Sequence, residues 1–171
     1  EGILEFVSRE LSAPGGGFYA SLDAESEGVE GKFYRWELEE IKSVLTAQEY
    51  ELFSKLYRLG EPPNFEEEFY APQLKMLMSE NAVARELSLA ELESQLTPIR
   101  KKLFDVRAKR KRPLLDTKIL AAWNGLMIRG YADAGRIFKN PDHIKTAERA
   151  ADFVLKKMTT QIHLVLLLPN L

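Results

Sequence analysis

The sequence contains no cysteine and only two histidines, His143 and His163. The absence of cysteine excludes disulfide bonds, thiolate nucleophiles, iron–sulfur clusters and cysteine-ligated zinc within these 171 residues. Two histidines leave little for a histidine-based metal site, because a zinc centre usually uses three or four side chains. We therefore predict no bound metal and no cofactor.

The sequence also lacks an excess of charge and a long hydrophobic run. Its 24 Lys and Arg residues nearly balance 26 Asp and Glu residues, whereas nucleic-acid-binding domains usually carry a strong basic excess. The longest apolar run, residues 162–168, is far shorter than the about 20 residues that span a bilayer. We expect a cytoplasmic protein with neither nucleic acid nor membrane as a partner.

That apolar run, at the C-terminal end of the sequence, shows no helical or strand periodicity. Either it is a buried strand or helix end, or the sequence departs from its native reading near Met158. We favour the second explanation. The predicted organisation is therefore one domain over residues 1–158 followed by an aberrant or truncated tail over residues 159–171.

Hydrophobic spacing and capping signals predict a mainly α protein. The capping boxes TAQE at Thr46 and SLAE at Ser88 each mark a helix start. A kink at Pro98 within one helix is the alternative to two helices meeting there. We also expect a loop over 61–72 and a short strand over 74–77. The helices are predicted over residues 3–11, 38–45, 46–57, 88–96, 98–109, 116–138 and 141–158.

An aromatic and acidic stretch over residues 18–36 predicts a two-stranded ribbon. Its strands are expected over 18–23 and 32–36, with an acidic tip over 24–31. The tip contains DAESEG, which imitates the start of a calcium-binding EF-hand loop. The imitation fails at the twelfth position, where Tyr34 replaces the bidentate glutamate. A solvated turn is the simpler interpretation.

The helix predicted to begin at Asp116 is apolar on almost every side, which indicates a position inside a larger helical assembly. Asp116 is explained as its N-cap. Lys118 in a first turn opposes the helix dipole and suggests an anionic partner, such as the acidic tip. Asn124 is expected to be buried, either bonded to a neighbouring loop or directed into a ligand cavity with Trp123.

A basic run also stands out, and two explanations are open for it. It could follow a phosphate backbone, or it could be solvated or paired with acids of the same chain. Acidic residues elsewhere balance the run and aromatic residues are not interleaved with it, so we favour the second explanation. The run holds Arg100, Lys101, Lys102, Arg107, Lys109, Arg110, Lys111 and Arg112.

Two motifs together resemble one family, the spermatogenesis-associated, thioredoxin-domain-containing proteins. The first motif is GGFYASLDAESEGVEGKFYRW over residues 16–36, and the second is RPLLDTKILAAWNGLMI over residues 112–128. Both match the family's patterns in order and spacing. The resemblance implies a partial (α/α)6 toroid, similar to N-acylglucosamine 2-epimerases and six-hairpin glycosidases, with a short β-ribbon near residues 16–36. The attached thioredoxin-like domain and the remaining barrel helices are then missing partners.

The resemblance also implies a sugar-sized pocket, because ribbons that begin GGFY line the mouth of such barrels. Carboxylates accept hydrogen bonds from sugar hydroxyls, and aromatic rings cover C–H faces. The catalytic candidates are Asp23, Glu27 and, in reserve, Asp116. The substrate-binding candidates are Tyr19, Glu25, Glu30, Lys118, Trp123 and Asn124.

The sequence departs from the family at Glu25 and Thr117, which replace aspartates, and neither motif contains the histidines used by the epimerases. Whether the chain belongs to an enzyme is therefore open. We expect a fragment of a carbohydrate-binding or carbohydrate-modifying barrel, inactive alone. In the full-length protein, activity would be that of a sugar isomerase or glycoside hydrolase. The alternative is a non-enzymatic client-binding or scaffolding module that serves the thioredoxin-like domain.

Overall fold

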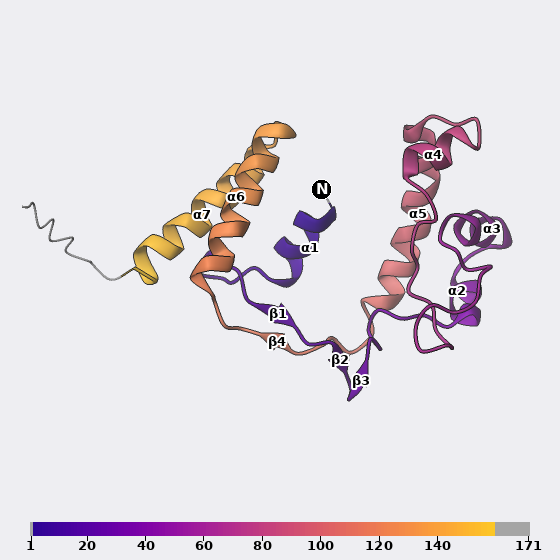
Figure 1. The fold of residues 1–171 in the computed structure, drawn as a ribbon, viewed down its shortest axis with the longest axis horizontal. Helices are drawn as coiled ribbons and strands as arrows, with labels where there is room; N and C mark the ends of the chain where they lie inside the picture. Colours follow the sequence, from indigo (N-terminus) through magenta and orange to yellow (C-terminus); the bar gives the residue numbers. More distant parts are fainter. Residues whose placement is uncertain (1, 160–171) are drawn as a thin grey trace, which may run out of the picture. The chain divides into compact units, whose positions relative to one another are not determined.

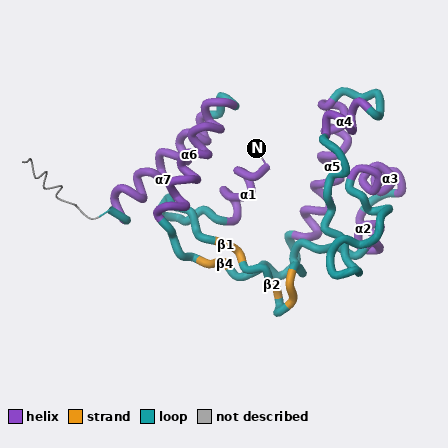
Figure 2. The backbone as a smooth tube through the Cα atoms, in the orientation of Figure 1, coloured by secondary structure: helices purple, strands orange, loops and turns teal. Residues whose placement is uncertain are grey.

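A computed structural model describes residues 2–159 and confirms that the chain is mainly α. The described part holds seven helices and four strands of two residues each (Figures 1 and 2). It divides into two compact units, one formed by residues 2–23 with 115–159 and the other by residues 24–114. Apart from Thr159, the predicted tail lies outside the described residues, as does His163. No helix within residues 2–159 has the length and apolar character to cross a bilayer.

The first unit, called unit 1, is built around two long helices that lie side by side (Figure 1). Glycine at position 135 permits this close packing, because an added Cβ would lie 2.5 Å from the Ile144 side chain. Tyr131 is fully buried in the core and stacks on Phe18 with the ring centres 5.4 Å apart. The elements of unit 1 are α1 (Gly2–Glu10), β1 (Ser21–Leu22), β4 (Leu115–Asp116), α6 (Ala121–Ile137) and α7 (Pro141–Lys157).

The GGFY segment lies directly against α7. An added Cβ on Gly17 would approach the Phe153 ring to 2.9 Å, and one on Gly16 would approach the Arg149 carbonyl oxygen to 2.9 Å. Gly16 also has φ of +111°, a conformation that residues with a side chain rarely adopt. Glycine is therefore required at these positions for Phe18 to reach the core.

The second unit, called unit 2, has its own hydrophobic core. Ile41, Leu56, Leu92 and Leu96 are completely buried there. The elements of unit 2 are β2 (Glu25–Ser26), β3 (Val29–Glu30), α2 (Leu38–Val44), α3 (Ala47–Leu56), α4 (Met78–Val83) and α5 (Leu89–Arg107).

The predicted helix starts are confirmed where they depend on hydrogen bonds between residues close in the sequence. Both predicted capping boxes form, at Thr46 with Glu49 and at Ser88 with Glu91. The prediction of two helices meeting at Pro98 is wrong, because α5 continues through this proline. Proline inside a helix costs about 3 kcal/mol. Each apolar side chain that α5 buries along one face stabilises the fold by roughly 1.5–3 kcal/mol. The burial of these side chains therefore outweighs the cost of placing Pro98 inside the helix. The buried side chains are Leu92, Leu96, Ile99 and Leu103.

The predicted ribbon of residues 18–23 with 32–36 is wrong. Ser21 and Leu22 pair instead with Asp116 and Leu115 in an antiparallel ladder. Residues 31–34 form a turn, and Trp36 makes a single bridge to Tyr70. The predicted acidic tip folds alone as the hairpin β2–β3.

Two further expectations are also corrected. Asp116 does not cap a helix: it lies in β4, and α6 begins at Ala121. Its carboxylate accepts a hydrogen bond from the Lys118 backbone N–H at 3.1 Å, a local turn bond that competes with capping. Residues 74–77 form a loop rather than a strand.

Candidate functional site

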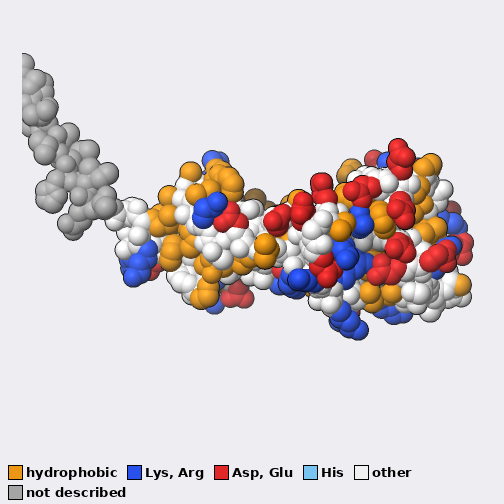
Figure 3. Space-filling view, turned by 90° about the horizontal axis from the view of Figure 1, so that it is seen from below, with side chains coloured by type: hydrophobic (Ala, Val, Ile, Leu, Met, Phe, Trp, Pro, Cys, Tyr) orange, Lys and Arg blue, Asp and Glu red, His pale blue; other side chains and the backbone are white. Residues whose placement is uncertain are grey.

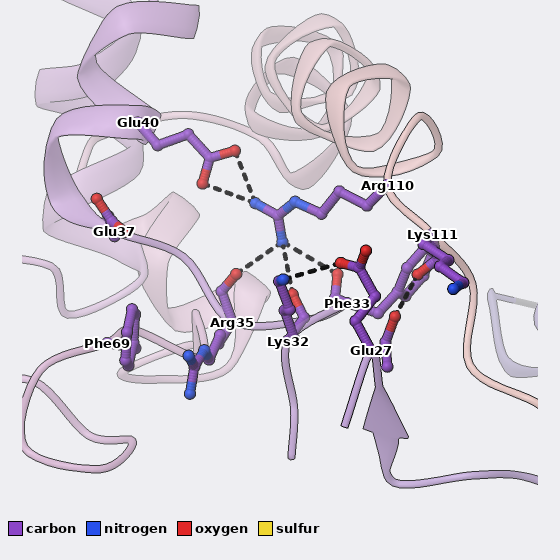
Figure 4. Close-up of a pocket in the computed structure, with 10 residues that line it drawn as sticks. Glu27, Lys32, Phe33, Arg35, Glu37, Glu40, Phe69, Arg110 and Lys111 are labelled. Atoms are coloured by element: carbon purple, nitrogen blue, oxygen red, sulfur yellow. Dashed lines mark hydrogen bonds and ion pairs between the residues drawn. The ribbon is translucent and has the colours of Figure 1, made fainter. Parts of the chain in front are cut away.

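A charged cavity of about 310 Å³ lies beside the β2–β3 hairpin in unit 2 (Figure 4). We call it the charged pocket. Its lining mixes acids, bases and aromatic rings, and Ser26 completes it. The basic residues are Lys32, Arg35, Arg110 and Lys111, the acids are Glu27, Glu37 and Glu40, and the aromatic residues are Phe33 and Phe69.

Arg110 holds one wall of the charged pocket in place. Its Nη2 donates to both carboxylate oxygens of Glu40, at 2.7 and 2.8 Å. Its Nη1 donates to the carbonyl oxygens of Phe33 at 3.0 Å and Arg35 at 2.7 Å (Figure 4). The guanidinium also lies 4.2 Å from the Trp36 ring centre. Charge-assisted bonds of this kind are stronger than neutral ones, so Arg110 fixes the turn that carries Lys32 and Phe33.

Glu27 lies at the tip of the hairpin, in a two-residue turn with Gly28. Both residues have positive φ, 57° and 73°, as a type I′ turn requires. The Glu27 carboxylate pairs with the Lys32 ammonium at 2.8 Å. The hydrogen bond and the charge of Lys32 lower the pKa of Glu27 below its usual 4.5. Glu27 is therefore an ionised acceptor at neutral pH, suited to bind a hydroxyl or to act as a base or nucleophile, but not as a proton donor.

Two other contacts shape the charged pocket. The Arg35 guanidinium lies over the Phe69 ring, 3.6 Å from its centre, and pairs with Glu66. The buried Ser26 hydroxyl donates to the Lys111 carbonyl oxygen at 2.5 Å, which ties the chain after Arg110 to the hairpin. A cationic plane stacked on an aromatic ring leaves a flat, partly polar wall.

A second cavity, of about 200 Å³, lies in unit 1 and is mainly apolar. It brings together three of the predicted substrate-binding residues, Tyr19, Trp123 and Asn124. The Trp123 side chain is 51% exposed. Asn124 is buried, and its amide accepts from the Phe18 N–H at 2.7 Å and donates to the Phe18 carbonyl at 3.0 Å. The predicted bond from Asn124 to a neighbouring loop is therefore present.

The remaining candidates of unit 1 lie on or next to the β1–β4 ladder. Asp23 follows β1, and Asp116 lies in β4. The Lys118 ammonium pairs with Asp116 at 3.0 Å, so the anion beside Lys118 is this neighbour. The backbone N–H of Lys118, followed by its side chain, lowers the pKa of Asp116. Asp116, like Glu27, is an ionised acceptor at neutral pH.

The predicted site residues thus fall into both units. Glu25, Glu27 and Glu30 lie on the β2–β3 hairpin, and Glu25 stands directly opposite Glu30. Of these three, Glu27 lines the charged pocket. The other six candidates lie in unit 1. Among residues 2–159, no group of three or more His, Asp or Glu side chains is placed to hold a metal ion.

Of the ten residues that line the charged pocket, Glu27 was identified from the sequence as a site residue and the other nine were missed. Arg110 was placed in a basic run expected to pair internally, and the structure identifies its acid as Glu40, 70 positions earlier. Neither partner carries a local signal of this pairing. The nine residues are Ser26, Lys32, Phe33, Arg35, Glu37, Glu40, Phe69, Arg110 and Lys111.

No family model matches the chain. Over 92% of its length the chain is 34% identical to human spermatogenesis-associated protein 20 and 33% identical to the rat protein. The mouse protein of the same name is 31% identical over the same share. These relatives support the family that the two motifs suggest. The match spans 23% of each spermatogenesis-associated protein 20, so the chain corresponds to about a quarter of these longer proteins.

Proposed function

We propose that the chain is part of a carbohydrate-binding or carbohydrate-modifying helical barrel, with the charged pocket as its sugar-binding surface. The observation that carries this proposal is the lining of the pocket. Carboxylates, cationic groups and flat rings surround a cavity of about 310 Å³, within the range of small-molecule sites.

The chemistry of a sugar matches each part of this lining. Ionised Glu27 accepts from a hydroxyl, while Lys32 and Lys111 donate to hydroxyl or ring oxygens. Phe69 is partly exposed and offers its ring to a C–H face, whereas Phe33 is only 5% exposed. The bonds that Arg110 makes to Glu40 and to the turn hold this surface in one conformation, so little of it has to be ordered on binding.

The lowered pKa values of Glu27 and Asp116 favour a role in sugar binding over a role as the proton donor of glycoside hydrolysis. A glycosidase needs one carboxylic acid that stays protonated to donate to the leaving oxygen. The lowered pKa of Glu27 and of Asp116 makes both ionised acceptors. If the full-length protein is an isomerase or glycoside hydrolase, these two act as base, nucleophile or hydroxyl acceptor. Asp23 remains the third catalytic candidate.

The partial (α/α)6 toroid belongs to this proposal. Large apolar side chains of α6 are exposed, among them Trp123 at 51%, Leu126 at 70% and Ile137 at 62%. In Figure 3, hydrophobic side chains gather over the unit that holds α6 and α7. Each Å² of such surface that becomes covered contributes about 25 cal/mol. The remaining barrel helices and the thioredoxin-like domain are the partners proposed to cover it.

The test is sugar binding by the full-length protein, measured calorimetrically against a panel that includes N-acetylglucosamine and neutral hexoses. A saturable signal that Glu27→Gln weakens at least tenfold supports the proposal. Glu51→Gln is the matched control, because Glu51 also pairs with a lysine, Lys55 at 2.7 Å, but lies on the exposed face of α3, outside the charged pocket. Equal loss in both variants, or no response to any sugar, contradicts the proposal.

The second candidate function is a client-binding or scaffolding module. The exposed apolar residues of α6 favour it, since such a surface suits a protein partner as well as further barrel helices. The two functions differ in the calorimetric screen. A scaffold would bind its partner protein and respond to no sugar.

A further inference from the structure

Unit 2 contains another cavity, of about 320 Å³, that the sugar proposal does not use. We call it the aromatic pocket. Its walls come from α3, from the second half of α5 and from the segment of Tyr34 and Trp36, and Pro72 closes one side. Every one of these residues lies within unit 2, so the cavity belongs to one compact part of the chain.

Aromatic rings form most of the walls of the aromatic pocket. Phe53 and Tyr57 stack with their ring centres 4.3 Å apart and the planes 26° from parallel. Trp36 and Phe53 are almost fully buried, whereas Tyr34, Tyr57 and Phe104 are partly exposed. Partly exposed rings around a cavity present π faces and edges to whatever enters it. A flat ring fits such a space in offset-stacked or edge-to-face contact.

The charged residues that line the aromatic pocket are both arginines, Arg100 and Arg107. The Arg100 Nε donates to the Tyr57 hydroxyl at 2.8 Å, and its Nη1 pairs with Glu93 at 2.6 Å. The Arg107 guanidinium lies 5.2 Å from the Tyr34 ring centre and 5.7 Å from that of Phe104. The described residues that line this cavity include no carboxylate, so both charged groups in the walls of the cavity are cationic. The cavity favours a ligand with a negative group.

We infer that the aromatic pocket binds a small planar aromatic carboxylate. The ring of the ligand packs among Tyr34, Tyr57 and Phe104, and its carboxylate meets Arg107 at the rim. A planar guanidinium suits a carboxylate because two parallel N–H donors match its two oxygens. The inference does not depend on sugar binding at the charged pocket, since the two cavities have different linings.

The experiment uses the full-length protein and two matched probes, indole-3-acetate, ionised at neutral pH, and its neutral analogue indole-3-acetamide. Saturation-transfer NMR on the probe needs little protein and reports binding directly. Arg107→Met removes the guanidinium and keeps an apolar stem. Lys101→Met removes one positive charge from the exposed side of the same helix, where Lys101 is 71% exposed, and serves as the control. Circular dichroism melting shows whether each variant folds.

The expected result is saturable binding of indole-3-acetate by the parent full-length protein and by its Lys101→Met variant. Binding should be at least tenfold weaker for the amide and for Arg107→Met. Tyr34→Ala, which removes a partly exposed wall of the pocket, should weaken the binding of indole-3-acetate to a similar degree. This variant tests the inference if Arg107→Met does not fold. Equal binding of acid and amide overturns the inference, as does parent-like affinity in the folded variants or no binding of the acid.

Discussion

The side-chain amide of Asn124 bridges both peptide groups of Phe18, 106 positions earlier. Its Oδ1 accepts from the Phe18 N–H at 2.7 Å, and its Nδ2 donates to the Phe18 carbonyl oxygen at 3.0 Å. Nδ2 also donates to the Leu120 carbonyl at 3.1 Å, so the start of α6 joins the same network. The two family-like motifs of the sequence thus meet through one buried amide.

Replacing Asn124 with alanine should lower the free energy of unfolding by about 2–6 kcal/mol. The substitution leaves the buried N–H and C=O of Phe18 without a partner, and each such group costs about 1–3 kcal/mol. Urea unfolding followed by circular dichroism measures the change. Arg129→Ala, on the exposed side of the same helix, should change stability by less than about 0.5 kcal/mol. Equal changes in the free energy of unfolding in the two variants would show that the Asn124 bridge is not a major stabilising contact.

Two glycine-to-alanine substitutions should have opposite effects. In Gly17→Ala the new Cβ would lie 2.9 Å from the Phe153 ring, so a loss of about 1–3 kcal/mol is expected. In Gly125→Ala the new Cβ meets open space within α6, and alanine should stabilise the helix by about 0.5–1 kcal/mol. Thermal unfolding of both variants tests this. Adding Phe153→Leu should partly restore Gly17→Ala, and a Gly17→Ala protein as stable as the parent would contradict the packing.

How far the sequence predicts this fold depends on the range of each contact. The capping boxes at Thr46 and Ser88 form as predicted because their bonds join residues three positions apart. The pairing of β1 with β4 joins Ser21 to Asp116, and no local pattern identifies that partner. Asp116 misled the prediction because an N-cap and a local turn bond use the same carboxylate and the same nearby N–H groups.

The same reasoning applies to the candidate site. Glu27 was identified because it lies in a distinctive acidic stretch, and its turn is set by the adjacent Gly28. Arg110 and Glu40 were not paired in advance, since an arginine in a basic run has many acids within reach of the folded chain. Periodicity identifies the buried face of a helix, but it does not identify which surface side chains meet.

Stability should fall with acid partly through Glu49. The hydrogen bond from Lys102, followed by that from the Thr46 N–H, lowers the pKa of Glu49 from its usual 4.5. Because the folded pKa lies below the unfolded one, the stabilisation is present above about pH 4.5 and is lost as the pH falls through the folded pKa. Unfolding free energies measured between about pH 5 and pH 3 should therefore decline less steeply in Glu49→Gln than in the parent.

The control for this measurement is Glu68→Gln, which removes an exposed loop carboxylate and changes the net charge equally. Identical pH profiles for Glu49→Gln and the parent would remove the capping box and the Lys102 pair from the explanation of acid sensitivity.

The isolated chain should self-associate or fold incompletely. Leu126 and Ile137 are 70% and 62% exposed on α6, and apolar side chains in water favour association. Sedimentation velocity should show species larger than the monomer at micromolar concentration. The double variant Leu126→Gln with Ile137→Gln should shift the distribution toward monomer. A monodisperse parent chain with a cooperative thermal transition would disprove this expectation.

The most direct measurement for sugar binding is a crystal structure of the full-length protein with the sugar that binds best in the calorimetric screen. The sugar is predicted to lie in the charged pocket, with a hydroxyl within hydrogen-bond distance of the Glu27 carboxylate and an apolar face against Phe69. A sugar bound elsewhere, or a charged pocket filled by another part of the protein, would contradict the account.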